Sequence, residues 1–152
     1  MAINRPTTKT IISTSNWGIP ITDEVNRLTT QSNTNTTDIT NLKPTAWTNA
    51  SLANGWTNWG GNVQVLQYRK VGDIVYIRGG LKSPGPSGAT VITTLPAGFR
   101  CSFQLEFPCT YYSGSRLVCG VTANGDGTLI AADIVPVNAL LSLTVVQYST
   151  LP

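Results

Sequence analysis

The sequence offers little material for catalysis, because its 152 residues include no histidine and seven carboxylates. These acids are Asp23, Glu24, Asp38, Asp73, Glu106, Asp126 and Asp133. Asp73, Glu106 and Asp133 stand isolated in sequence, although a glycosidase pair can assemble in space from distant acids. No G-x-S-x-G, P-loop or metal motif occurs. We therefore predict no catalytic residue, no metal ligand and no cofactor, and keep a glycan-degrading enzyme as a remote alternative.

Three cysteines are the next candidates for chemistry. An odd number without a secretion signal argues against a disulfide framework, and zinc would need a fourth ligand at tighter spacing. Side-chain alternation places them on the apolar faces of two strands, with Cys101 and Cys109 in one and Cys119 in the other. Phe103, Leu105 and Phe107 share the first of these faces. The cysteines are thus predicted to be small buried apolar residues.

Aromatic residues are the remaining candidates for a ligand site. Trp56 and Trp59 lie in a segment with four large apolar residues, and Tyr111 and Tyr112 stand side by side before a predicted turn. Exposed aromatic rings can stack on the apolar faces of sugars, whereas most large aromatics pack in cores or interfaces. Both interpretations stay open for these four residues.

The composition excludes several classes of function. Charged residues make up 11% of the chain, the net charge is +3, and no basic cluster exceeds Arg69-Lys70. Nucleic-acid binding is not favoured, because it requires a concentrated basic patch. No apolar run has transmembrane length and the first residues do not form a signal peptide, so we expect a soluble chain made in a cytoplasm, without membrane insertion.

The stretch from residue 21 to residue 43 is predicted to form a helix with one apolar stripe. Steps of four and three residues connect seven positions in heptad register: Ile21, Val25, Leu28, Ser32, Asn35, Ile39 and Leu42. The intervening residues are mediocre helix formers, so an isolated helix would be marginal. The pattern favours a short parallel trimeric coiled coil, in which polar core residues fix the register. A flexible Thr/Asn-rich linker is the alternative.

The segments on either side of this helix have different expected roles. Residues 1–20 lack a helical period but contain Ile11, Ile12, Trp17 and Ile19, which could anchor an extended arm on a partner protein. A disordered tail is the alternative. Residues 44–62 form a Trp-rich neck that is expected to pack under the following domain or between protomers.

Residues 63–152 are predicted to form an all-β head. Short alternating segments are separated by turn signals, and Asn124-Gly125-Asp126-Gly127 predicts a hairpin turn rather than a calcium loop. Pro108 interrupts a long predicted strand and should lie at an edge or bulge. The fold class is therefore mainly β, a β-sandwich or jelly roll preceded by the arm and the coiled coil.

Several segments resemble a known group of proteins. Residues 54–61, 67–79 and 94–100 resemble the C-terminal heads of small tailed-phage virion proteins, which include tail fibres, receptor-binding proteins and head fibres. Residues 13–20, followed by Asp23 and Val25-Asn26, resemble an N-terminal attachment segment of such proteins. The resemblance covers most of residues 13–130. It implies a homotrimer with a β-sandwich head that joins the virion through its N terminus, and it implies no catalytic residue.

These observations predict a structural virion protein. In the first hypothesis it is a short tail or baseplate fibre, attached to virion proteins by its arm, whose three heads bind host-surface glycan with avidity. In the second it is a capsid decoration protein or head fibre. The sequence does not separate the two, because they share the same parts.

Overall fold

A computed structural model describes residues 21–85 and 90–151 of the chain. The predicted docking residues Ile11, Ile12, Trp17 and Ile19 lie outside these ranges. The chain divides into two compact units, Met1–Leu42 and Lys43–Pro152, and each is described by itself. No helix among the described residues is long and apolar enough to cross a lipid bilayer.

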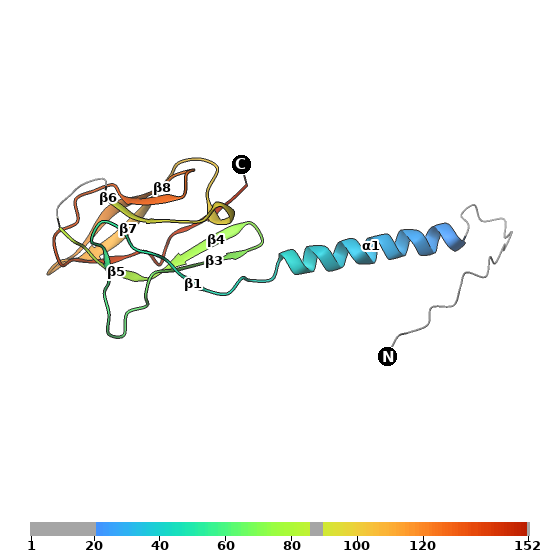
Figure 1. Ribbon diagram of the computed structural model, residues 1–152, viewed down its shortest axis with the longest axis horizontal. Helices are drawn as coiled ribbons and strands as arrows, with labels where there is room; N and C mark the ends of the chain where they lie inside the picture. The colour runs from blue at the N-terminus through green and yellow to red at the C-terminus, as the bar shows by residue number, and fades with distance from the viewer. Residues whose placement is uncertain (1–20, 86–89, 152) are drawn as a thin grey trace. The chain divides into compact units, whose positions relative to one another are not determined.

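The described part of the first unit is one helix, α1, over Ile21–Asn41 (Figure 1). Asp23 and Glu24 lie in its first turn, where negative charge complements the helix dipole. Glu24 also accepts two hydrogen bonds from Arg27, of 2.8 and 2.6 Å, which hold the pKa of its carboxyl below the ordinary value. The helix ends at Asn41, two residues before its predicted end at Lys43, because Pro44 disfavours helical backbone in the residue before it.

Threonine hydroxyls along α1 are satisfied within the helix itself. Six of them donate to the carbonyl oxygen four residues earlier, at 2.8 to 3.1 Å: Thr29, Thr30, Thr34, Thr36, Thr37 and Thr40. None of these threonines occupies a heptad core position. The apolar core positions, in contrast, are open to solvent in the single chain, since Ile21, Val25, Leu28, Ile39 and Leu42 are between 51% and 65% exposed.

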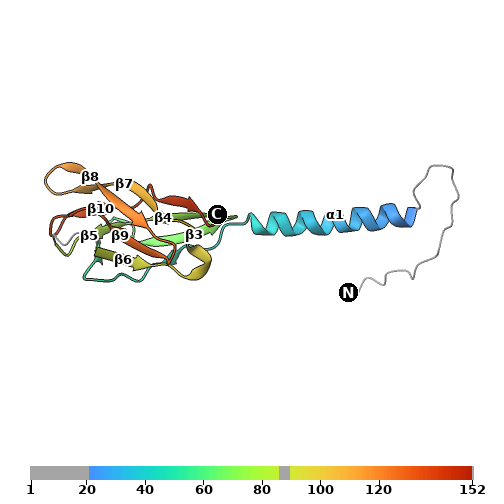
Figure 2. The same ribbon diagram turned by 90° about the horizontal axis from the view of Figure 1, so that it is seen from above.

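The second unit contains two antiparallel sheets. The smaller has the order β1-β3-β4-β11, from strands Thr48–Asn49, Gln67–Val71, Ile74–Arg78 and Gln147–Ser149. The larger has the order β2-β5-β10-β7-β8-β9-β6. Its strands are Thr57–Asn58, Gly80–Lys82, Leu140–Ser142, Leu105–Tyr112, Arg116–Ala123, Thr128–Ala131 and Thr90–Thr94. One short 3-10 helix, Ala97–Phe99, follows β6 (Figures 1 and 2). The prediction of a mainly β fold after an N-terminal helix is confirmed.

Both sheets contribute to a single core. Val75 and Ile77 from β4 belong to the same buried cluster as Leu81 from β5, Leu129 from β9 and Leu141 from β10. Cys101, Cys109 and Cys119 are buried, unpaired members of this cluster, so the prediction of structural cysteines is confirmed. The turn Asn124–Gly127 connects β8 to β9, as predicted, and Gly127 has the positive φ of 93° that favours glycine there.

The chain passes from the smaller sheet to the larger at Gly79, between β4 and β5. Gly79 has φ of 144°, and a Cβ atom there would lie 2.6 Å from the Cα atom of Leu66. Because that neighbour is backbone, no side-chain rotation could relieve the clash. Glycine is therefore required at this crossing, where residues 65 and 66 run directly against it.

Two details of the predicted long strand differ from the structure. The strand was expected from Cys101, but β7 begins at Leu105, and Ser102 instead donates a hydrogen bond to the carbonyl of Thr150. Phe103 consequently does not share the buried face and is 66% exposed. Pro108 does lie at a local edge, because the pairing of β7 with β10 begins at Thr110 and leaves Pro108 with β8 alone.

The neck residues lie against the β domain. Thr45 and Lys70 exchange hydrogen bonds of 2.8 Å, and the amide of Ala50 donates to the carbonyl of Leu66 at 2.9 Å. β1 and β2 come from this segment, and each is an edge strand of its sheet.

Candidate functional site

The outer face of the larger sheet carries a row of side chains that combines aromatic, aliphatic and cationic groups. Tyr112 on β7 pairs with Arg116 on β8 and with Leu140 on β10, and Leu140 pairs in turn with Lys82 on β5. Directly paired residues point to the same face of a sheet. The next residues along β10 and β5 are fully buried, so this row faces away from the core.

Two pockets lie along this face on either side of β10. The first has a volume of about 310 Å³ and is lined by Thr110, Tyr111, Tyr112, Arg116, Leu140 and Ser142. The second has a volume of about 240 Å³ and is lined by Val63, Gln64, Arg78, Gly79, Gly80, Leu140, Ser142 and Thr144. Because both include Leu140 and Ser142, they adjoin, and we call them together the β10 trough.

The charges along the trough are all positive. Arg116 lines the first pocket and Arg78 the second, while Lys82 lies beside Leu140 in the outer row. Within the described ranges, the ion pairs are Arg27 with Glu24 and Lys70 with Asp73, so these three cations have no carboxylate partner there. A surface with aromatic and aliphatic area, hydroxyl groups and unpaired cations is suited to a polar ligand with apolar faces.

The second pocket contains an arginine with a fixed orientation. The guanidinium of Arg78 lies 3.8 Å from the centre of the Trp47 ring and donates from Nε and Nη2 to Oε1 of Gln67, at 3.1 and 2.8 Å. Arg69 lies over the same indole at 4.5 Å. Trp47 therefore interacts with two guanidinium groups, one of which lines the trough.

The predicted ligand contacts have different surroundings. Tyr112 is 50% exposed in the trough, and Tyr111 lines it while packing against the core. Trp59 is exposed and its amide donates to the carbonyl of Gly80 at 3.0 Å, but it lines neither pocket of the trough. Trp56 is 4% exposed and belongs to the core, so its ring faces are covered and the hypothesis of a stacking contact does not extend to it.

Arg78, Lys82, Arg116 and Leu140 were not recognised from the sequence. Alternation along the strand could have placed Tyr112 and Arg116 near one another, because they flank a three-residue turn. The position of Leu140 beside Tyr112 depends on the pairing of β10 with β7, which joins residues far apart in sequence. Nothing in the local pattern near residue 140 predicts that register.

Two isolated acids also come together, at a separate pocket of about 340 Å³. Oδ2 of Asp133 accepts a hydrogen bond of 2.6 Å from the amide of Gly120, and Oε1 of Glu106 lies 2.9 Å from where a Cβ atom of Gly120 would be. This pocket shares no lining residue with the β10 trough. Asp73, the third isolated acid, pairs with Lys70 at 3.6 Å instead.

Comparisons with known proteins give a likeness of fold. No protein-family model and no curated protein matches the sequence. The solved head domain of the lactococcal phage bIL170, described as a receptor-binding domain, matches with a TM-score of 0.53 at 20% identity, over 70% of this chain and 98% of that one. The receptor-binding protein of Listeria phage PSA matches with a TM-score of 0.62 at 15% identity, over 93% of each chain. The fold of this chain is thus the fold of phage receptor-binding proteins.

Proposed function

We propose that this chain is a receptor-binding fibre subunit of a tailed-phage virion, with a head that binds host-surface glycan in the β10 trough. The fold that it shares with the two phage receptor-binding proteins supports the virion assignment. The trough supports the glycan, because Tyr112 and Leu140 offer apolar area beside the hydroxyl groups of Thr110 and Ser142.

The architecture in this proposal is a homotrimer. Its three copies of α1 form a parallel coiled coil through the exposed heptad stripe, and residues 1–20 attach the fibre to tail or baseplate proteins. The exposure of that stripe in the single chain supports the coil, because a helix with these residues needs partners to be stable. The head is a β-sandwich of the jelly-roll type, supported by the core that its two sheets share. Three heads on one fibre raise the affinity for a repetitive surface through avidity.

A tail position is favoured over a capsid position by the likeness to receptor-binding proteins. Immunogold labelling of particles that bear this polypeptide tests the assignment. Gold at the tail tip is expected, and gold restricted to the head shell would establish the alternative, a capsid decoration protein.

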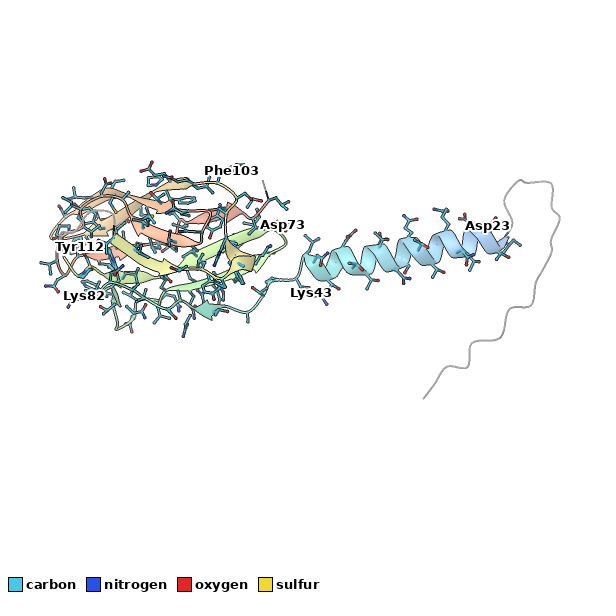
Figure 3. The ribbon with its side chains drawn as sticks, turned by 45° about the horizontal axis from the view of Figure 1, so that its top comes forward. Asp23, Lys43, Asp73, Lys82, Phe103 and Tyr112 are labelled. Atoms are coloured by element: carbon cyan, nitrogen blue, oxygen red, sulfur yellow. The ribbon has the colours of Figure 1, made fainter. Side chains whose placement is uncertain are left out.

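The trough is tested by binding of the full chain to an array of bacterial surface oligosaccharides. We expect Tyr112→Ala to reduce the signal at least tenfold, because the half-exposed ring offers a stacking face beside Leu140. Phe103→Ala is the matched control, since Phe103 is 66% exposed and lies at the opposite end of the β domain from Tyr112 (Figure 3). Equal losses for the two variants would remove the trough from the proposal.

The carboxylates Glu106 and Asp133 favour the remote alternative of a glycan-degrading enzyme only weakly, because they line a pocket separate from the trough. Incubation of the protein with host-wall polysaccharide is expected to leave its viscosity unchanged. A fall in viscosity that Glu106→Gln abolishes would establish hydrolysis instead.

A further inference from the structure

The Arg78 side of the β10 trough differs in chemistry from the Tyr112 side. Leu140 and Ser142 line both pockets, but the aromatic rings belong to the first pocket, whereas the pocket around Arg78 adds Val63, Gln64 and Thr144 and has no aromatic lining residue. The two pockets meet at Leu140 and Ser142, with Tyr112 of β7 in the first and Arg78, the last residue of β4, in the second. A ligand that contacts both pockets therefore occupies both sides of β10.

Arg78 is held in place before any ligand arrives. Trp47 covers one face of its guanidinium at 3.8 Å, and Gln67 accepts from Nε and Nη2 through the same oxygen. The Nη1 group makes no hydrogen bond to any residue in the described ranges, and no carboxylate pairs with the side chain there. One end of the guanidinium fork therefore remains available.

The free end of a guanidinium is complementary to two oxygens held in a plane or on one phosphorus atom. An arginine with restricted motion loses less entropy when it forms such a pair than a mobile one does. Arg116 in the trough and Lys82 beside Leu140 add positive potential, and none of the described acids lines the trough.

We infer that Arg78 determines specificity: its pocket selects a sugar unit bearing a carboxylate or phosphate, while a neighbouring unit covers Tyr112. The ligand is then an acidic oligosaccharide of at least two units. This inference rests on the proposed glycan-binding function. Trp47 is a positioning residue in this scheme, because it contacts Arg78 but lines neither pocket.

The experiment compares full-length wild type and variants on an array that carries neutral, carboxylate-bearing and phosphate-bearing oligosaccharides of matched length. Wild type is expected to bind acidic members at least tenfold more strongly than neutral ones. Arg78→Gln should reduce this ratio to about one, and Arg78→Lys should retain part of it. The carboxylate and phosphate arms identify which anion the pocket prefers.

The role of Trp47 is tested by the same ratio of acidic to neutral binding. If Trp47 only stabilised the fold, its substitution would weaken both signals equally and leave the ratio unchanged. Trp47→Ala should lower the preference for acidic glycans, and Trp47→Phe should restore most of it, because a phenyl ring still offers a face to Arg78. Melting temperatures measured in parallel identify any variant that does not fold. If Arg78→Gln does not fold, Arg78→Lys replaces it in the comparison.

The possible results separate the two proposals. Binding without any acidic preference, or an acidic preference that survives Arg78→Gln, overturns the inference and leaves the glycan-binding function standing. The absence of binding to every member of the array overturns the proposed function, and the inference with it. Both proposals are supported if the preference for acidic glycans is lost in Arg78→Gln and in Trp47→Ala but is largely kept in Trp47→Phe.

Discussion

Cys109 and Cys119 are titratable residues whose environment changes strongly between the unfolded chain and the folded protein. They face one another in register on β7 and β8, and both are essentially inaccessible to solvent. Burial disfavours the thiolate and raises the pKa of Cys109 to about 12 and that of Cys119 to about 11, from an ordinary value of 9.0. Both thiols are consequently protonated and unreactive at neutral pH.

These two pKa shifts predict a loss of stability in alkaline solution. Above pH 9 the unfolded chain releases thiol protons that the folded protein keeps, so the free energy of unfolding falls as pH rises towards 11 to 12. Each thiol lowers the free energy of unfolding by at most about 1.4 kcal/mol per pH unit. Urea unfolding under reducing conditions at pH 8, 9 and 10 measures the slope. The slope should be shallower in the double variant Cys109→Ala with Cys119→Ala, and an identical slope would contradict the assignment to these thiols.

The sequence predicted single residues well where alternation along one strand decides burial. Cys109 and Cys119 were placed correctly in the interior for this reason. Phe103 was not, because alternation applies only inside a strand and β7 begins two residues later. Trp56 shows a different limit, since the local sequence left both packing and exposed stacking open, and tertiary packing placed the indole in the core.

At the scale of elements, α1 was the most predictable part of the chain. Its heptad register, the acids in its first turn and the proline beyond its end lie within one local stretch, and together they gave bounds within two residues of those observed. The strands β1 and β2 were missed because each has two residues and exists only through its partner, β3 or β5. No pattern of period two can be recognised over two residues.

The proposed coiled coil leads to a prediction at the scale of the helix. Val25→Asp with Leu28→Asp places three carboxylates in each of two adjacent core layers of a trimer, where they are desolvated and repel one another. We expect the protein to become monomeric, with the β domain still folded, as measured by light scattering and near-ultraviolet circular dichroism. Asn26→Asp with Asn33→Asp is the control, because it adds the same charges outside the heptad core and should leave the mass unchanged. A trimeric mass for the Val25/Leu28 variant would contradict the coil.

At the scale of the whole molecule, the order of strands could not be predicted from the sequence. β10 pairs with both β5 and β7, so residues near positions 80, 110 and 140 form one surface. The trough and its second pocket exist only because of this non-local pairing, and Arg78 owes its orientation to Trp47, 31 positions earlier. The candidate site was therefore partly predicted, through Tyr111 and Tyr112, while its cations depended on the fold.

The last prediction concerns the separate roles proposed for residues 1–20 and for the rest of the chain. If residues 1–20 dock the fibre and the remaining residues fold and trimerise, deletion of residues 1–20 should leave a soluble trimer that binds glycan but is not incorporated into particles. The large apolar residues of the arm should supply most of the docking energy. Ile11→Ala, Ile12→Ala, Trp17→Ala and Ile19→Ala, combined in one chain, should therefore reproduce the effect of the deletion. A variant with Thr7→Ala, Thr8→Ala, Thr10→Ala and Ser13→Ala should be incorporated normally, because it keeps those anchors. Purified particles assembled in the presence of each variant are assayed by immunoblot, and normal incorporation of the shortened chain would show that attachment uses another part of the molecule.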